Sequence, residues 1–372
     1  MVTQGTVPSE ISDEQRSGEP ISEALLSKLY EALLSHTAGQ VAAYLPHLVP
    51  EDPDMWGVAF CPVDGGPLIS FGDASTLFSL GSLHAPLSYC LARLTQKSFE
   101  AVHTRVGCEP SGCAFNHLAL QPSGTPHNPM VNAGCIVVSG LCCAADDSTG
   151  AVESVDARMR RAQNLFGKMG LSSSRTADTS STSNCCKHNS AVNTVDHAAA
   201  LAEKEIGDRN VCLAYLARES RVAFGPGTIS RGELDSHLEF YYQLCALRGD
   251  CRSLAVVAAT LANGGTNPVT QESTELTHGT TVPDCLNLLY TCGMYDYSGT
   301  FAMRVGLPAK SGVSGGMIVV IPGVGGFCLF SPKLDRWGNP LRGIEFCNRL
   351  AAATGGRYHI FRRGFALSVG KN

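Results

Sequence analysis

Hydrophobic residues recur at helical spacing near the start of the chain. Leucines at this spacing between Leu25 and Leu34 predict an amphipathic helix, which we expect Gly39 to terminate. The apolar run Trp56–Phe60 precedes an Asp-Gly-Gly sequence at 64–66, and this combination predicts a strand that enters a hairpin.

Two further apolar runs lie near the other end, Met317–Ile321 and Phe327–Phe330, with a glycine-rich turn between them. They predict a second hairpin. The segments between the two hairpins show mainly helical patterns. The sequence therefore predicts a fold of the α/β class, α+β in type, in which an antiparallel sheet joins N- and C-terminal segments and a helical lobe fills the middle.

Three segments have compositions that do not support a packed core. We expect residues 1–20 to be a disordered tail and residues 356–372 to be a C-terminal tail, on either side of one module over 21–355. Inside that module, residues 171–193 are rich in Ser and Thr with few large apolar side chains, which predicts a flexible insertion. Loop-closure entropy grows slowly with length, so such an insertion is tolerated.

Composition excludes several classes of function. With 44% hydrophobic and 16% charged residues, the chain of 372 residues fits a soluble globular protein with a large core. A net charge of -5 gives no electrostatic reason to expect nucleic acid or an anionic membrane surface as a partner. No apolar run approaches the ~20 residues that span a bilayer. The first residues lack the pattern of a signal or transit peptide, so we expect a cytoplasmic location.

The sixteen cysteines do not form a recognisable metal or disulfide pattern. Cys135, Cys212 and Cys245 lie in apolar helical context, so we expect them to be buried as small hydrophobic side chains in a reducing compartment. The adjacent pairs at 142–143 and 185–186 lack the two-residue gap of zinc sites. A metal bound by 185–188 remains the weaker alternative, and we expect neither metal nor cofactor.

Candidate chemistry concentrates between Cys292 and Gly316. This run contains Tyr295, the triplet Lys310-Ser311-Gly312 and a glycine pair at 315–316. A Lys-Thr-Gly or Lys-Ser-Gly triplet on an edge strand is typical of serine acyl enzymes of the β-lactamase and penicillin-binding type. The triplet alone leaves an acylase or a β-lactam-type hydrolase open, and any string this short recurs by chance.

The longer run is more specific, because ordered blocks accompany it along residues 23 to 350. Together these blocks resemble serine-dependent glutaminases, and they are Gly39–Pro46, Glu109–Gly112, Asn128–Gly134, Gly207–Asn210, Leu261–Pro268 and Ser331–Asn339. The resemblance implies the β-lactamase-like fold, hydrolysis of the side-chain amide of L-glutamine through an acyl-serine intermediate, no cofactor, and a homodimer or homotetramer.

The resemblance places the nucleophile at Ser82 and shows two departures beside it. The family has Ser-x-x-Lys, a spacing that puts the lysine one helical turn above the serine and within reach of its proton. Here Ala85 takes the place of that lysine, and Gly81 takes the place of a glutamine that helps to hold substrate.

Other residues could supply the missing base. His84 has suitable chemistry, but its position two residues after Ser82 turns it roughly 200° away on a helix. Lys310 is the better candidate, because a buried lysine can lose its charge. The resemblance places Tyr295 near the serine and the leaving group, where it could also carry protons.

Six side chains are assigned to the glutamine pocket by the resemblance: Tyr44, Asn132, Glu203, Asn210, Tyr241 and Tyr295. Glu203 would pair with the substrate ammonium, and the two asparagines and Tyr241 would bind its carboxylate. The backbone N–H groups of Ser82 and Val313 would form an oxyanion hole.

Each of these residues also has an ordinary structural interpretation. Glu203 would be a solvated helical charge, Tyr241 would belong to an amphipathic core, and Asn132 would cap a helix. We expect Arg209 and Asp208 to form a structural ion pair rather than to contact substrate.

Two functional hypotheses therefore stand. The chain is either a glutaminase or a catalytically impaired glutaminase-like protein that binds glutamine or glutamate, or regulates an active paralogue. The family resemblance extends over nearly the whole chain, which favours an active glutaminase. The pocket residues match the family while the lysine of Ser-x-x-Lys is absent, which favours the impaired protein.

Overall fold

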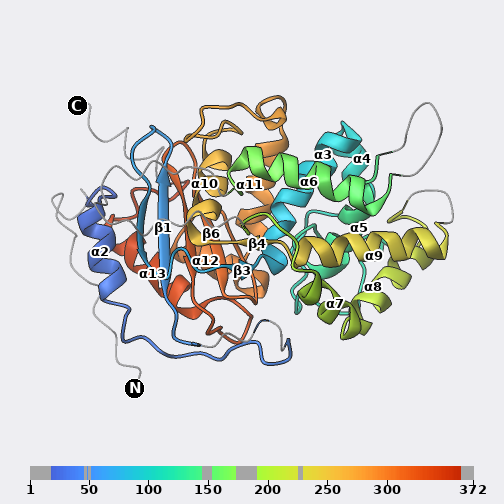
Figure 1. Cartoon of the computed structure of the whole chain (residues 1–372), viewed down its shortest axis with the longest axis horizontal. Helices are drawn as coiled ribbons and strands as arrows, with labels where there is room; N and C mark the ends of the chain where they lie inside the picture. Colours follow the sequence, from blue (N-terminus) through green and yellow to red (C-terminus); the bar gives the residue numbers. More distant parts are fainter. Residues whose placement is uncertain are drawn as a thin grey trace, which may run out of the picture.

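The computed structural model describes residues 18–45, 48, 52–144, 153–172, 191–224 and 229–361. Figure 1 shows the arrangement of its helices and strands. Most of the predicted N-terminal tail, of the Ser/Thr-rich insertion and of the C-terminal tail lies outside the described residues.

An antiparallel sheet joins the two ends of the chain, as the sequence predicts. Its order is β2-β1-β7-β6-β5, and every neighbouring pair is antiparallel. The central pairing runs from Gly57 opposite Phe330 to Pro62 opposite Gly325. The strands are β1 (Gly57–Pro62), β2 (Ile69–Gly72), β5 (Ala309–Ser311), β6 (Gly316–Ile321) and β7 (Gly325–Phe330).

Helices cover the sheet and form the separate lobe seen in Figure 1. Next to the sheet lie α2 (Glu23–Glu31), α10 (Cys251–Ala262), α12 (Ser298–Arg304) and α13 (Leu341–Ala353). The remaining helices are α3 (His84–Gln96), α4 (Phe99–His103), α5 (Asn132–Leu141), α6 (Val155–Met169), α7 (His197–Glu205), α8 (Asp208–Glu219), α9 (Arg231–Cys245) and α11 (Thr281–Cys292). The predicted α+β architecture is confirmed.

The sheet separates two hydrophobic clusters. Along β6, Met317 and Val319 belong to the cluster that contains α2 and α13, whereas Ile318 and Val320 belong to the cluster that contains α10. Successive strand residues point to opposite faces, so both faces are buried only if the strand is apolar throughout. This requirement explains the unbroken apolar run of β6.

Two local features differ from the sequence predictions. The first helix ends at Glu31, well before Gly39, and its N-cap is Ser22. Gly39 instead has a φ of 102° where the backbone passes Leu334, and a Cβ there would meet the Leu334 carbonyl oxygen at 2.8 Å. Cys212 is exposed, whereas Cys135 and Cys245 are buried as predicted.

A short two-stranded ribbon fixes the start of the helical lobe. Strand β3 (Phe78–Ser79) pairs with β4 (Arg248–Gly249), and the Leu80 amide donates to the Leu247 carbonyl at 2.8 Å. The chain then forms the 3₁₀ turn η2 (Gly81–Leu83), which contacts β5 and leads into α3. The ribbon thereby sets Ser82 beside the strand that carries Lys310.

In the described part of the chain, each helix is too short or too polar to cross a membrane. The cytoplasmic location stays a prediction from the sequence.

Candidate functional site

A cavity of about 250 Å³ opens between the sheet and the helical lobe. Its walls come from η2, the start of α5, the α7–α8 junction and α9. Seven residues that the resemblance assigns to the site line this cavity: Tyr44, Ser82, Asn132, Glu203, Asn210, Tyr241 and Val313.

Ser82 lies on η2, immediately before α3. Gly81 has a φ of 48°, a left-handed conformation that glycine adopts without strain. Ala85 is only 1% exposed, so its side chain packs into the core and supplies no base to Ser82.

Lys310 and Tyr295 meet behind Ser82. Lys310 Nζ lies 4.3 Å from the centroid of the Tyr295 ring, and both polar groups donate to the Ser311 carbonyl, the phenol at 3.1 Å. Complete burial lowers the pKa of Lys310 from 10.5 to about 7. Burial raises the pKa of Tyr295, while its hydrogen-bonding interaction with Ser82 opposes that rise. The three side chains therefore form one connected group.

Tyr295 is held in a strained conformation. Its φ of 55° lies in the left-handed region, which is uncommon for a bulky residue and costs of order 1–3 kcal/mol. Ser298 stabilises this turn, since its Oγ donates to the Tyr295 carbonyl at 2.7 Å and accepts from the Met294 amide at 3.0 Å. Strain that the surroundings maintain in this way is typical of functional sites.

His84 is unsuited to act as the base. Its ring is completely buried, and Nδ1 lies 2.8 Å from Ser88 Oγ while Nε2 has no partner among the described residues. Burial, and then the nearby Lys310, lower the pKa of His84 to about 3. The imidazole therefore stays neutral and faces the edge of Tyr241 rather than Ser82.

Four helices supply polar side chains to the cavity wall. Asn132 is the first residue of α5 rather than its cap, which is Val131, and its Nδ2 donates to Asn210 Oδ1 at 2.9 Å. Glu203 is half-buried on α7. Tyr241 is 5% exposed on α9, and burial, followed by the neighbouring Cys245, raises its pKa well above the usual value. Tyr241 is therefore a neutral donor.

The Val313 amide supplies a donor at the cavity wall. Among the described residues, this N–H has no hydrogen-bond acceptor, although its neighbours Ser311 and Gly312 donate to Gly293 and Gly316. Ser314 Oγ is also buried without a partner in the described chain, and a Cβ at Gly81 would meet it at 3.7 Å. Unpaired buried donors are costly, and they are what an oxyanion site needs.

Sequence reasoning missed part of the wall. Phe115 and Cys245 line the cavity, and Phe115 packs against Tyr295 with ring centroids 4.9 Å apart. Arg209 also lines the cavity; its guanidinium donates to the Asn116 carbonyl at 3.4 Å, and the expected ion pair with Asp208 is wrong. Phe115 comes from a loop, Arg209 from the first turn of α8 and Cys245 from the end of α9, three segments that lie far apart in the sequence.

The described residues contain no cluster of three or more His, Cys, Asp or Glu side chains that could hold a metal ion. The segment 185–188, where the sequence left a metal open, lies outside them.

Known proteins that resemble this chain are glutaminases. The glutaminase family model matches residues 39–193 and 168–361. The chain is 40% identical to the mitochondrial liver isoform of glutaminase from Mus musculus over 331 residues, 88% of this chain and 49% of that protein. It is 36% identical to a glutaminase from Trichormus variabilis over 338 residues, 91% of this chain and 89% of that protein.

The chain spans about half the length of the putative glutaminase 2 of Caenorhabditis elegans and of the mouse protein. Among solved structures, Mglu in its glutamate form superposes with a TM-score of 0.75 at 31% identity, covering 94% of this chain and 70% of that one. A probable glutaminase, ybaS, has the same TM-score at 27% identity and covers 95% and 100%. These neighbours have the β-lactamase-like fold, and the chain belongs to the glutaminase family.

Proposed function

We propose that this chain hydrolyses L-glutamine to L-glutamate and ammonia, with Ser82 as the nucleophile and Lys310 as the base in place of the missing lysine. The observation that carries the proposal is the complete burial of Lys310 against the ring of Tyr295, which in turn interacts with Ser82, with the pKa of Lys310 lowered to about 7. About half of the Lys310 side chains are then neutral at pH 7, which is the state that accepts a proton.

We infer the following proton relay from the Ser82–Tyr295 interaction and from the packing of Lys310 against the Tyr295 ring. Ser82 Oγ attacks the side-chain carbonyl carbon of glutamine as its proton passes to Tyr295, and the phenolic proton passes to neutral Lys310. The two amides of Ser82 and Val313 bind the developing oxyanion. Protonated Lys310 returns the proton through Tyr295 to the leaving nitrogen, which departs as ammonia. Water then hydrolyses the acyl-Ser82 ester by the same relay in reverse.

Polar side chains that line the cavity would bind the amino-acid end of the substrate. Glu203 faces the substrate ammonium, while Asn132, Asn210 and Tyr241 donate to its carboxylate. Tyr44 also lines the cavity and is 59% exposed. The glutamate form of the related Mglu supports the same ligand class.

The test measures release of ammonia and glutamate from L-glutamine by the purified chain, with Ser82→Ala and Lys310→Met as controls. Turnover that both substitutions abolish supports the proposal. Turnover that survives Lys310→Met refutes the base assignment. Calorimetric binding of glutamine without turnover identifies the second candidate, an impaired glutaminase-like protein, which the burial of Ala85 at the usual lysine position favours.

We also propose a homodimer or homotetramer. Exposed apolar side chains on α7 and α8, among them Leu201, Val211 and Tyr215, support a helical interface. Light scattering coupled to gel filtration measures the assembly, and a monomer at micromolar concentration refutes it.

A further inference from the structure

Ser311 is the last residue of β5, a strand at the edge of the sheet. Pro308 and Gly312 form main-chain hydrogen bonds with β6. Bonded and non-bonded positions alternate along an antiparallel pair, so the N–H and the carbonyl of Ser311 point toward the open edge. There the Ser311 N–H donates to the Gly293 carbonyl at 3.2 Å. This bond docks the turn that carries Tyr295 onto the edge of β5.

The Ser311 carbonyl accepts hydrogen bonds from both members of the proposed relay. Lys310 Nζ and the Tyr295 phenol donate to this one oxygen, the phenol at 3.1 Å. Hydrogen bonds have narrow ranges of length and angle. The position of the Ser311 carbonyl therefore sets how the lysine lies relative to the phenol.

Within the described chain, the titratable neighbours of Lys310 are neutral. Burial raises the pKa of Tyr295, and it raises the pKa of Cys135 on α5 to about 12. Burial, and then Lys310 itself, lower the pKa of His84 to about 3. A hydrogen bond to the charged form of a group favours that form. The bond to the Ser311 carbonyl therefore favours the protonated state of Lys310.

The Ser311 side chain is held by a distant turn of the chain. Its Oγ donates to Asn339 Oδ1 at 2.5 Å, and both residues are 0% exposed. The Asp335 carboxylate fixes Asn339, because it accepts from the Asn339 amide at 2.9 Å and from Nδ2 at 3.3 Å. Gly338 of the same turn lies beside Tyr295, since a Cβ there would be 3.7 Å from the ring. This turn thus holds Ser311 in addition to the main-chain bonds of β5.

We propose that Ser311 and Asn339 are positioning residues for the reaction, because their hydrogen bond fixes the carbonyl that holds Lys310 against Tyr295. The inference rests on the proposed function, in which these two side chains carry the proton. Neither Ser311 nor Asn339 is part of the cavity wall, so they act through the relay and not on the substrate. A displacement of about 1 Å at a reacting centre lowers rates about 100-fold.

The experiment compares Ser311→Ala, Asn339→Leu and the double variant with the unsubstituted chain in glutamine turnover. We expect each single substitution to lower kcat by about tenfold or more, with KM within about threefold. The inflection of kcat/KM near pH 7 should move to lower pH by about half a unit or more, because the charged lysine loses an aligned acceptor. The double variant should be no slower than the slower single variant, since both substitutions break one bond.

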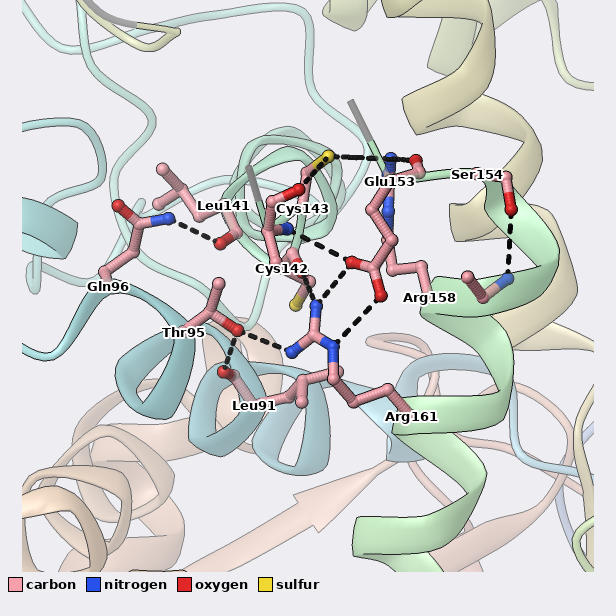
Figure 2. A network of polar contacts seen from close by, with 12 residues as sticks. Leu91, Thr95, Gln96, Leu141, Cys142, Cys143, Glu153, Ser154, Arg158 and Arg161 are labelled. Carbon is pink, nitrogen blue, oxygen red and sulfur yellow. Dashed lines mark hydrogen bonds and ion pairs between the residues drawn. The ribbon is translucent and has the colours of Figure 1, made fainter. Parts of the chain in front are cut away.

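Thr95→Val is the matched control, because it removes a hydrogen-bonded hydroxyl at the other end of α3 from Ser82. Thr95 Oγ1 donates to the Leu91 carbonyl and accepts from Arg161, both at 2.8 Å, and Figure 2 shows this network between α3 and α6. The substitution leaves the Arg161 donor unpaired, so it should lower the Tm. It should keep kcat within about threefold and leave the inflection where it is.

Unchanged kcat and an unchanged inflection in Ser311→Ala overturn the proposal. So does an equal loss of kcat in Thr95→Val, which would indicate a general effect of lost stability. Effects that multiply in the double variant also contradict it, because the two residues would then act separately. If Asn339→Leu unfolds, Ser311→Ala decides alone, since it removes the same bond and leaves the contacts between Asn339 and Asp335 in place.

A second readout does not depend on turnover. The NMR signal of the Lys310 ε-carbon, identified by its absence in Lys310→Met, reports the pKa of this lysine directly. A chain that does not hydrolyse glutamine contradicts the proposed function, and the NMR titration then decides the positioning role. A lower Lys310 pKa in Ser311→Ala supports that role, and an unchanged pKa overturns it.

Discussion

Replacing Lys310 with methionine should stabilise the fold while it abolishes turnover. The side chain is 0% exposed, and burial lowers its pKa from 10.5 to about 7. Methionine has a similar length, fills the same space and carries no charge. A residue that costs stability and is retained in the core indicates a function there.

The magnitude follows from the pKa difference. The unfolded chain binds more protons than the folded chain between pH 7 and 10.5, so the cost to folding is fully present below pH 7 and disappears as the pH rises toward 10.5. One pKa unit corresponds to about 1.4 kcal/mol, so the cost is about 4 kcal/mol at pH 7 and about 2 kcal/mol at pH 9. The lost hydrogen bond to the Ser311 carbonyl offsets about 1 kcal/mol.

The assay is urea denaturation of both proteins at pH 7 and pH 9. We expect Lys310→Met to exceed the unsubstituted chain by about 3 kcal/mol at pH 7 and by about 1 kcal/mol at pH 9. Both proteins contain the same buried thiols, so the contribution of thiol titration cancels when one free energy of unfolding is subtracted from the other. Lys28→Met on the exposed face of α2 is the control, with an expected change within about 0.5 kcal/mol.

The reasoning is refuted if Lys310→Met is less stable than the unsubstituted chain at pH 7. It is also refuted if the stability difference between the two proteins is as large at pH 9 as at pH 7, because burial would then not have lowered the pKa of Lys310. Glutamine turnover within threefold of the unsubstituted chain refutes its role as the base, whatever the stability shows.

Four further predictions concern the site. Ala85→Lys should raise glutamine turnover by about 10³, measured as ammonia release, and an unchanged rate would mean that the site does not lack a base. Adding Gly81→Gln should lower stability by about 1–2 kcal/mol in thermal unfolding, because φ there is 48°. Tyr295→Phe should lower kcat at least 100-fold with little change in KM, and an equal rise in KM would indicate a binding role instead. The value of kcat/KM should rise with pH through about 7 as Lys310 loses its proton, and a profile flat from pH 6 to 8 would contradict this assignment.

Much of the architecture follows from the sequence alone. The apolar runs at 56–60, 317–321 and 327–330 are fixed by a local requirement, since a strand buried on both faces must be apolar throughout. The same holds for the N-terminal helix, whose periodicity is local; its end is not marked by Gly39, since the helix ends at Glu31 and Gly39 lies where the chain passes Leu334.

The site depends on the sequence for its residue types and on tertiary structure for their chemistry. The motifs identify Ser82 and Lys310 as candidates, but neither spacing nor composition states how deeply a lysine is buried. Only the packing of β5 behind η2 lowers the pKa of Lys310 and sets it against Tyr295. Charge states in a protein interior are set by what surrounds a group in space, and the order of residues along the chain does not record this.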